Sequence, residues 1–523
     1  MSQWIDDYYA DVDAGNLDGF LNRHAPDASV VFGNNPPAVG RAAIRAAIGG
    51  LFAAVSLMRH EKHNVWPVGD GKSAVVELSV LYRTHGGAEV RLASVALLDR
   101  DDAGLVTSLR VFTDLAPLYT VIEAEKASQT HTWDPHAELH SLETSAHGDM
   151  AAPYAELLGR CPVARIRVDG SKVNWWGAFS HAEMVEAARA HQTLSSTTPS
   201  SGPAIIPLQA DPPLHGKYRK ALNPHFTREM IDRLEPDIRR YAREMISDLV
   251  SRGSADLAQD FAFPFPTRVL CRFLGVPDDQ WTFHHEFIAD VDRSTGHGLN
   301  DPDDPVPDRL FATILPRLRE LIEDHRRNPR EDVVSGILAG DFEEPEILNL
   351  ILTIMFAGHI TTTSGLGNTL LRLARDTELQ DYLRANSHRI PDAIEESLRI
   401  DTPQQAMPRK ALVDVELGGE TIRAGELILL NFASANLDPK VWPDAGRFDL
   451  DRADKRHVAF GRGLHQCIGQ NLARLELRIA LEEILAATSS FSISGDIARR
   501  TWPLLCVNHL PTSLQPVAAS AVR

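Results

Sequence analysis

The strongest constraint on how this chain folds is one cysteine in a glycine-rich loop placed directly before a predicted helix. The loop is Phe460-Gly461-Arg462-Gly463-Leu464-His465-Gln466-Cys467-Ile468-Gly469, and apolar spacing predicts a helix over 471–485. A thiolate at a helix N-terminus faces unpaired N–H donors and the positive end of the helix dipole, so its charged form is favoured. The glycines let the backbone pass close beneath a large flat group.

Two interpretations of Cys467 are open from these residues. A lone cysteine before an amphipathic helix is commonly a buried structural residue. The spacing of Phe460, the glycines, His465 and Cys467 favours a ligand loop, and it resembles the cysteine-ligand loop of the haem-thiolate monooxygenases, the cytochrome P450 family. The resemblance implies that Cys467 ligates the iron of haem b (iron protoporphyrin IX), and that Phe460, Gly461 and Gly469 also contribute to binding the cofactor.

Length, composition and charge narrow the class of protein. A chain of 523 residues is expected to hold two domains, and its 43 % hydrophobic and 24 % charged residues are typical of a soluble globular protein. The net charge of −18 argues against nucleic acid and anionic membranes as partners. Four widely separated cysteines and an acidic N-terminus indicate a cytoplasmic protein. The most apolar segments, 46–58 and 350–360, fall short of the about 20 residues that span a bilayer.

Residues 1–122 have the pattern of a small domain of their own. Apolar spacing predicts two helices, with one strand-like run between them and three more, separated by turn residues, after the second helix. The predicted helices are 5–20 and 41–58, and the predicted strands are 27–32, 73–83, 89–99 and 105–115. Helices followed by a meander of long strands predict an α+β cone with an antiparallel sheet.

Two segments of this first domain carry a second resemblance. The run Phe32-Gly33-Asn34-Asn35-Pro36-Pro37-Ala38-Val39-Gly40-Arg41 and the run Arg110-Val111-Phe112-Thr113-Asp114 resemble the SnoaL-like, nuclear-transport-factor-2-like superfamily. Its members include cyclases and isomerases with an acid or base inside the cone, and also dimerisation modules without activity. The resemblance places Asp114 at the carboxylate position of the cyclase-like members, and His24 and His60 could line the cavity.

The alternative interpretation of Asp114 is a strand-end residue bonded to Arg110 or to backbone. We favour it, because a fold alone does not define a function. A module that forms a homodimer, or that shapes the substrate channel of its neighbour, explains residues 1–122 equally well. Residues 123–150 are polar and contain four histidines, of which His136 and His140 have the spacing of a helical metal pair. No third ligand is evident, so we expect a solvated linker there, followed by a haem domain over 151–523.

Further residues of the second domain bear on cofactor binding. His215 and Arg219 are four residues apart, so on a helix they project from one face and suit a carboxylate. The resemblance implies that they bind a haem propionate, with Arg409 and His465 as additional donors. Glu396 and Arg399 also share a helical face. With Arg447 they resemble a buried ion network that is structural rather than catalytic.

The predicted helix 345–375 contains the run Ala357-Gly358-His359-Ile360-Thr361-Thr362. It resembles the helix that crosses the distal face of haem, which implies that Gly358 and Thr361 open a groove for dioxygen. A hydroxyl and an ordered water can relay protons to bound oxygen. The family usually has Asp or Glu directly before the threonine, whereas Ile360 cannot carry a proton.

Three explanations of Ile360 remain open. Polar groups of the substrate or water supply the relay, another side chain does so, or the enzyme does not activate dioxygen in the ordinary way and is driven by peroxide. The retention of Thr361 favours the first. The resemblance places the substrate pocket at Met355, Phe356, Gln405, Ala406 and Val507. These stretches are largely apolar, so we expect a hydrophobic small molecule such as a terpenoid, polyketide or aromatic compound.

The functional expectation follows from the ligand type. A thiolate pushes electron density onto haem iron and favours O–O cleavage, which indicates a monooxygenase. The sequence shows no dinucleotide fingerprint, flavin segment or cysteine cluster for iron–sulfur, so ferredoxin and ferredoxin reductase or equivalent donors are implied, docking near Arg462. The first domain then acts as an accessory or dimerisation module, or as a second enzyme that catalyses a cyclisation or isomerisation.

Overall fold

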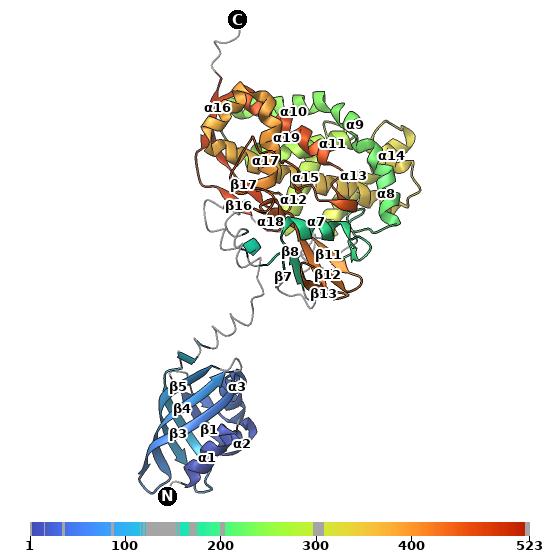
Figure 1. Cartoon of the computed structure of the whole chain (residues 1–523). Coiled ribbons are helices and arrows are strands. Elements are labelled where there is room, and N and C mark those ends of the chain that lie inside the picture. The colour runs from blue at the N-terminus through green and yellow to red at the C-terminus, as the bar shows by residue number, and fades with distance from the viewer. Residues whose placement is uncertain are drawn as a thin grey trace. The chain divides into compact units, whose positions relative to one another are not determined.

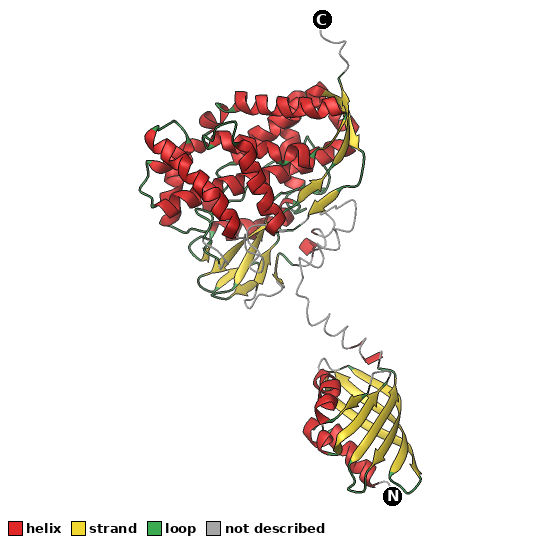
Figure 2. Cartoon of the chain, turned by 180° about the vertical axis from the view of Figure 1, so that it is seen from behind, coloured by secondary structure: helices red, strands yellow, loops and turns green. Residues whose placement is uncertain are grey.

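The chain divides into two compact units, which are seen in the computed structural model of Figures 1 and 2. We call Met1–His131 the cone unit and Thr132–Arg523 the helical unit. The structure describes residues 3–14, 16–33, 37–84, 88–115, 117–118, 121, 154, 157–159, 161–166, 175–198, 204–295, 308–500 and 502–517. The expected linker 123–150, with His136 and His140, lies outside these residues.

The cone unit is a six-stranded sheet with helices on one face (Figure 2). The strand order is β2-β1-β6-β5-β4-β3, and every pair is antiparallel except β1 with β6, which is parallel. Burial alternates strictly along β4 and β5, so one face of the sheet packs on the core and the other faces outward. The elements are α1 (Gln3–Asp13), α2 (Leu17–Asn22), β1 (His24–Phe32), β2 (Ala38–Val39), α3 (Arg41–Ala54), β3 (Val55–Val68), β4 (Ser73–Thr84), β5 (Glu89–Arg100) and β6 (Val106–Thr113).

The α+β cone is confirmed, with three differences in detail. The predicted helix 5–20 is two helices, and the sheet contains one parallel pair. The predicted helix 41–58 ends at Ala54, and the missed strand β3 begins at the next residue. Two register shifts against β4 interrupt the alternation of β3, so its sequence lacks a clean strand period. Pairing with β4 then overrides the local preference of this segment.

The helical unit is mainly α-helical with small sheets, as predicted (Figure 1). Its sheets have the orders β7-β8-β14-β11-β9, β10-β18-β15, β12-β13 and β16-β17. The helices are α7 (His181–Arg189), α8 (Leu214–Leu222), η1 (Asn223–Phe226), α9 (Arg228–Asp232), α10 (Glu235–Arg252), η2 (Ala258–Ala262), α11 (Pro264–Phe273), α12 (Trp281–Thr295), α13 (Asp308–Arg327), α14 (Val333–Leu338), α15 (Glu344–Arg375), α16 (Thr377–Ala385), η3 (Ser387–Arg389), α17 (Ile390–Ile400), α18 (Phe432–Asn436), η4 (Gly463–His465) and α19 (Gln470–Ala487). The strands are β7 (Val163–Ile166), β8 (Trp175–Ala178), β9 (Leu194–Ser195), β10 (Ser254–Asp256), β11 (Ala406–Ala411), β12 (Val415–Leu417), β13 (Glu420–Ile422), β14 (Leu427–Asn431), β15 (Thr488–Ile493), β16 (Ala498–Arg500), β17 (Cys506–His509) and β18 (Pro511–Pro516).

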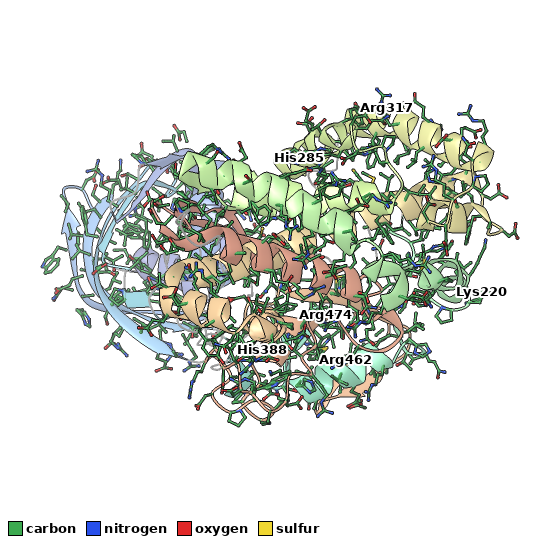
Figure 3. The ribbon with its side chains drawn as sticks, turned by 90° about the horizontal axis from the view of Figure 1, so that it is seen from above. Lys220, His285, Arg317, His388, Arg462 and Arg474 are labelled. Carbon is green, nitrogen blue, oxygen red and sulfur yellow. The ribbon has the colours of Figure 1, made fainter. Side chains whose placement is uncertain are left out.

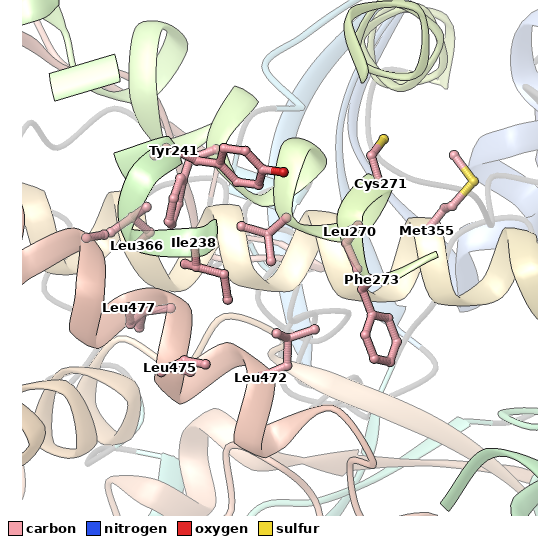
Figure 4. Close-up of a cluster of buried hydrophobic side chains, with 14 of the residues drawn as sticks. Ile238, Tyr241, Leu270, Cys271, Phe273, Met355, Leu366, Leu472, Leu475 and Leu477 are labelled. Atoms are coloured by element: carbon pink, nitrogen blue, oxygen red, sulfur yellow. The ribbon is translucent and has the colours of Figure 1, made fainter. Parts of the chain in front are cut away.

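The helix α15 forms the centre of this unit. Figure 4 shows α10, α11, α15 and α19 contributing side chains to one buried cluster, among them Tyr241, Leu270, Leu366 and Leu472. Among the helices described, α15 is long and apolar enough by length and composition to cross a membrane, but 56 % of its most apolar window is buried in the protein. Its apolar character is therefore explained by packing within the core.

A buried ion network ties the helix α17 to the polypeptide before Cys467. Arg399 donates to Glu396 through Nε at 2.9 Å and through Nη2 at 2.8 Å, and both side chains are inaccessible to solvent. The second guanidinium on Glu396 belongs to Arg452, at 3.0 Å, and not to Arg447 as expected. Arg447 is exposed and contributes its backbone carbonyl, which accepts from Arg452 at 2.9 Å.

Candidate active site

The loop before α19 is shaped by glycines that no other residue could replace without strain. Gly461 and Gly463 have φ of 69° and 73°, in the left-handed region that side chains disfavour. A Cβ on Gly463 would come within 2.4 Å of the Ala188 carbonyl oxygen at the end of α7. The loop is closed by the Cys467 N–H, which donates to the Phe460 carbonyl at 2.8 Å. Arg474 lies 4.3 Å above the ring of Phe460 and fixes this aromatic residue from the side of α19.

The electrostatics of Cys467 combine two opposing effects. Burial raises the pKa of the Cys467 thiol, and the N–H groups of Gly469 and Gln470 and the guanidinium groups of Arg219 and Arg474 oppose that rise. The position at a helix N-terminus therefore acts in the expected direction, but burial outweighs it. A metal ion that binds a thiol sulfur deprotonates it outright. The buried Cys467 sulfur would therefore become a thiolate on binding a metal ion.

Four polar side chains from three separate segments converge beside this loop. His215 and Arg219 come from α8, Arg409 comes from β11, and His465 precedes Cys467 by two residues. The rings of His215 and His465 are 4.4 Å apart, centroid to centroid. Burial lowers the pKa of His465 to about 3, with further lowering by Arg409, His215 and, least of all, Arg219, against an opposing effect of Asp211. The four groups are thus close enough to repel one another's charge.

None of these four side chains forms an ion pair within the part of the chain that the structure describes, although Asp211 is near enough to oppose the lowered pKa of His215, Arg409 and His465. His215 Nδ1 and His465 Nε2 are buried without a hydrogen-bond partner. Arg409 is 7 % exposed and donates to the Pro408 carbonyl at 2.7 Å, and burial lowers its pKa to about 10 against the opposing effect of Asp211. Asp211 itself is held by the hydroxyl of Ser195 and by the N–H of Ser196.

Buried cations and unpaired donors are costly unless an anion joins them. The two propionates of haem supply two such anions on one flat molecule, and the sulfur of Cys467 lies next to Arg219, which donates to the Gln466 carbonyl at 3.2 Å. The donor set therefore fits haem, with the propionates on the histidine–arginine cluster and the iron on Cys467.

The run 357–362 lies in the middle of α15, and its residues point in two directions. Ala357, Ile360 and Thr361 share one face of the helix and are less buried than most of their neighbours. Thr361 donates its hydroxyl to the Ala357 carbonyl at 2.8 Å, a bond that bends helices toward an open groove. A Cβ on Gly358 would lie 2.8 Å from Leu270, so this glycine permits close packing of α11 instead of opening the groove.

His359 points away from the face of Thr361. It is fully buried, and its Nε2 lies 2.8 Å from the Phe263 carbonyl oxygen. Burial lowers the pKa of His359 to about 4, so the imidazole is neutral at ordinary pH and donates that hydrogen bond. His359 therefore does not replace the missing acid at Ile360.

The five residues expected to line a substrate pocket have different environments. Met355 and Phe356 are buried in α15, with the ring of Phe356 5.8 Å from that of Phe287. Gln405 is fully buried and both ends of its amide are engaged, by the hydroxyl of Tyr154 at 3.0 Å and by the Thr402 carbonyl. Ala406 is buried at the start of β11. Val507 is buried against Gly367 of α15, since a Cβ added to this glycine would lie 3.5 Å from the Val507 side chain. Gln405 thus has a structural role.

The cone unit also differs from expectation at its candidate acid. Asp114 follows β6, is exposed, and does not line the cavity inside the cone. His60 does line that cavity, and its Nδ1 is 2.6 Å from Asp13 Oδ1. His24 is buried, with Nδ1 2.9 Å from the Phe20 carbonyl and Nε2 3.3 Å from the Tyr8 hydroxyl. The pair His60–Asp13 was missed because its members are 47 residues apart.

The loop of Cys467, with the unpartnered His215 Nδ1 and His465 Nε2 beside it, fits a haem-thiolate protein, and comparison with known proteins agrees. Residues 308–495 match the cytochrome P450 family model, and residues 5–109 match the SnoaL-like domain model. Cytochrome P450 130 of Mycobacterium tuberculosis is 31 % identical over 341 residues, which cover 60 % of this chain and 82 % of that protein.

Two further relatives have more specific names. Mycinamicin IV hydroxylase/epoxidase of Micromonospora griseorubida is 31 % identical over 374 residues, covering 67 % of this chain and 89 % of the relative. The solved structure of a mutant of P450 EryK in complex with erythromycin B has a TM-score of 0.62 and 29 % identity, covering 71 % of this chain and 98 % of that one. The chain therefore belongs to the cytochrome P450 family: it is a haem b monooxygenase with a SnoaL-like domain at its N-terminal side.

The donor cluster makes a prediction about haem retention. Replacing Arg409→Met removes a buried cation but keeps the length of the side chain. We expect haem to dissociate about 10- to 100-fold faster, since a charge-assisted hydrogen bond contributes about 1.5–3 kcal/mol. Transfer of haem to excess apomyoglobin measures the rate. The control is Arg423→Met, which removes an exposed arginine paired with Asp414 and should leave the rate unchanged. Equal rates for both variants would remove Arg409 from the propionate site.

Proposed function

We propose that this protein oxidises a hydrophobic small molecule with dioxygen, using electrons delivered by ferredoxin and ferredoxin reductase or an equivalent pair. The observation that carries the proposal is the cluster of buried donors beside Cys467, because it would match the charges of the haem propionates. Bound haem supplies the activation of dioxygen. The side chains of the chain hold that cofactor, exclude water and move protons.

In this proposal Cys467 ligates the iron, and His215, Arg219, Arg409 and His465 hold the propionates. Thr361 is the proton-relay residue of the distal face, because its hydroxyl can rotate from the Ala357 carbonyl toward an ordered water. Because Ile360 stands where the family usually has an acid, no carboxylate precedes Thr361. The ordered water or a polar group of the substrate therefore completes the relay. This arrangement makes oxidation depend on a correctly seated substrate.

We infer a hydrophobic secondary metabolite as the substrate. The buried Met355 and Phe356 provide an apolar wall on α15, in agreement with a largely apolar ligand. The names of two similar proteins, mycinamicin IV hydroxylase/epoxidase and P450 EryK with erythromycin B, support a secondary metabolite as the substrate. Terpenoids and aromatic compounds remain within the proposed class, alongside polyketides.

Electron donors would dock on the side of the cysteine loop. Arg462 lies within that loop (Figure 3). Burial, and then Arg189 and Arg456, lower the pKa of Arg462, and Asp454, which pairs with Arg456 at 2.8 Å, opposes them. The remaining positive charge of Arg462 and Arg189 would attract an acidic partner on an otherwise acidic protein of net charge −18. We propose an acidic ferredoxin as that partner, and the cytoplasm as the compartment in which the two meet.

The ligand assignment is tested by spectroscopy of the reduced protein under carbon monoxide. The wild-type protein should show the red-shifted absorption band that is typical of a thiolate ligand, because sulfur donates electron density to the iron. Cys467→Ala should lose this band, whereas Cys271→Ala, which removes another buried cysteine, should keep it. Persistence of the band in Cys467→Ala would overturn the proposed function.

The relay makes a prediction about coupling. We expect Thr361→Ala to lower product formed per electron pair by about tenfold or more, with hydrogen peroxide released instead, because proton delivery contributes at least about 10²-fold in such steps. Ser364→Ala is the matched control, since Ser364 makes the same type of bond, to the Ile360 carbonyl at 2.8 Å, but is fully buried. Product, peroxide and reductant consumption are measured together.

The same assay addresses the second candidate, a peroxide-driven enzyme, which Ile360 favours. If hydrogen peroxide alone supports turnover of wild-type protein as fast as dioxygen with the reductase, and Thr361→Ala keeps that rate, the dioxygen-dependent proposal fails. No turnover with peroxide would reject the peroxide-driven alternative.

For the cone unit we propose a homodimer through the outer face of its sheet. Four large apolar side chains are 36 % to 55 % exposed there, namely Trp66, Val95, Leu97 and Phe112. Val95 and Phe112 are directly opposed on β5 and β6, and Trp66 and Leu97 both pair with Val75. A contiguous apolar patch of this kind on a sheet face is typical of an interface, and a second copy offers a self-complementary surface.

Phe112→Glu tests this interface. A charge on the β6 side of the patch should weaken the dimer by about tenfold or more, because burying an unpaired carboxylate is costly. Sedimentation velocity over a dilution series measures the dissociation. Val39→Glu is the control. Val39 is 61 % exposed on β2, which is the edge strand at the opposite end of the sheet from β3 and lies outside the patch. A wild-type protein that stays monomeric, or a Phe112→Glu dimer of unchanged strength, would contradict the proposal.

A further inference from the structure

Ser196, the residue directly after β9, has a buried hydroxyl for which the described residues provide no partner. It is 3 % exposed, and its Oγ forms no hydrogen bond with the part of the chain that the structure describes. Polar side-chain atoms buried to this degree are usually bonded. The neighbouring Ser195 follows that rule, since its hydroxyl donates to Asp211. A ligand atom at Ser196 would supply the bond that the polypeptide does not make.

The backbone of Ser196 is bonded to an acid that adjoins the donor cluster beside Cys467. The N–H of Ser196 donates to Asp211 Oδ1 at 2.9 Å. Asp211 precedes His215 by four residues, and its carbonyl accepts the N–H of His215 at 3.0 Å. Burial lowers the pKa of both histidines of the cluster and of Arg409, and the charge of Asp211 opposes that lowering in all three. Ser196 therefore lies at the edge of the cluster.

Strand pairing leads to the same position independently. In the antiparallel pairing of β9 with β11, Ser195 pairs with Lys410. Continuing this register by one residue brings Ser196 opposite Arg409, since the two chains run in opposite directions. Directly opposed residues of such a pair are neighbours. The unpartnered hydroxyl thus belongs to a residue next to one of the buried cations that we assign to haem.

We propose that Ser196 is a further donor to a haem propionate, in addition to the two histidines and two arginines of the cluster. Its hydroxyl would donate one hydrogen bond to a carboxylate oxygen of the cofactor. Asp211 is a positioning residue, because an ionised carboxylate only accepts hydrogen bonds and so holds the Ser196 N–H without bonding the propionate. The proposal rests on the haem site of the proposed function.

A neutral donor suits this position. The cluster already holds four side chains that carry or can carry positive charge, and they lower one another's pKa. Another buried cation would add to this repulsion before the cofactor binds. A hydroxyl adds a hydrogen bond to an ionised acceptor without adding charge, and such bonds are stronger than those between neutral groups.

Ser196→Ala tests the proposal, because it removes the hydroxyl and leaves the backbone bond to Asp211 in place. We expect the full-length holoprotein to release haem to excess apomyoglobin about tenfold faster, the effect of losing one hydrogen bond to a charged group. Ser94→Ala is the matched control. Ser94 is 4 % exposed in the cone unit, and its Oγ likewise has no partner among the described residues. Its variant should release haem at the wild-type rate.

A second measurement separates a propionate contact from a structural role of Ser196. Wild-type protein and Ser196→Ala are loaded with iron etioporphyrin, in which alkyl groups replace both propionates. If Ser196 acts through a propionate, the two proteins should release this analogue at equal rates. If the variant only loosens the fold, it should accelerate the release of haem and of the analogue by the same factor, and that result would overturn the proposal.

The outcomes also separate this proposal from the haem site on which it rests. Faster haem release by Arg409→Met, with an unchanged rate for Ser196→Ala, would overturn the role of Ser196 alone. Unchanged rates for both variants would remove the propionate site of the proposed function as well. A carbon monoxide spectrum of each reduced variant checks that the thiolate ligand is retained, so that a change in release rate is not caused by loss of the Cys467 bond.

Discussion

The haem side of this protein depends on one buried ion pair, Glu396 with Arg399. Two buried charges are stable only when each forms its full set of hydrogen bonds. Removing one partner of such a pair costs about 3–5 kcal/mol. Arg399 satisfies its remaining donor with the Asn436 carbonyl at 2.8 Å, and the Asn436 side chain accepts the N–H of Val458 at 2.7 Å. Val458 then accepts from Gly461 at the start of the cysteine loop. The loop is thus held in place by the same bonds that neutralise a buried charge.

The donor cluster beside the loop follows the opposite principle. His215, His465 and Arg409 are buried, but the described residues leave His215 Nδ1 and His465 Nε2 without a partner and give Arg409 only a backbone carbonyl. In the pair Glu396–Arg399 the chain supplies both charged groups, which makes this region rigid. In the donor cluster it supplies only the donors, as a binding site for the haem propionates would require. Haem binding is therefore expected to stabilise the folded helical unit, because the unfolded chain cannot present these donors together.

The cone unit assigns separate roles to the two faces of its sheet. Strict alternation along β4 and β5 sends one set of side chains inward to the cavity and the other set outward to the patch that contains Val95 and Phe112. The proposed homodimer therefore uses only the outward side chains and leaves those that line the cavity untouched.

The sequence by itself determined the ligand loop, the run 357–362 and the pair His215 and Arg219, because each is a local pattern whose chemistry is carried by neighbouring residues. It also predicted the helices that became α15 and α19, since long apolar periods survive in the fold. Only the tertiary structure decided features that depend on partners distant in the chain. Arg452 instead of Arg447 completes the ion network, Gly358 accommodates Leu270, and the strand β3 forms because β4 pairs with it. The dyad of His60 and Asp13 belongs to the same group, because a sheet edge and a helix 47 residues apart must meet before the two side chains can bond.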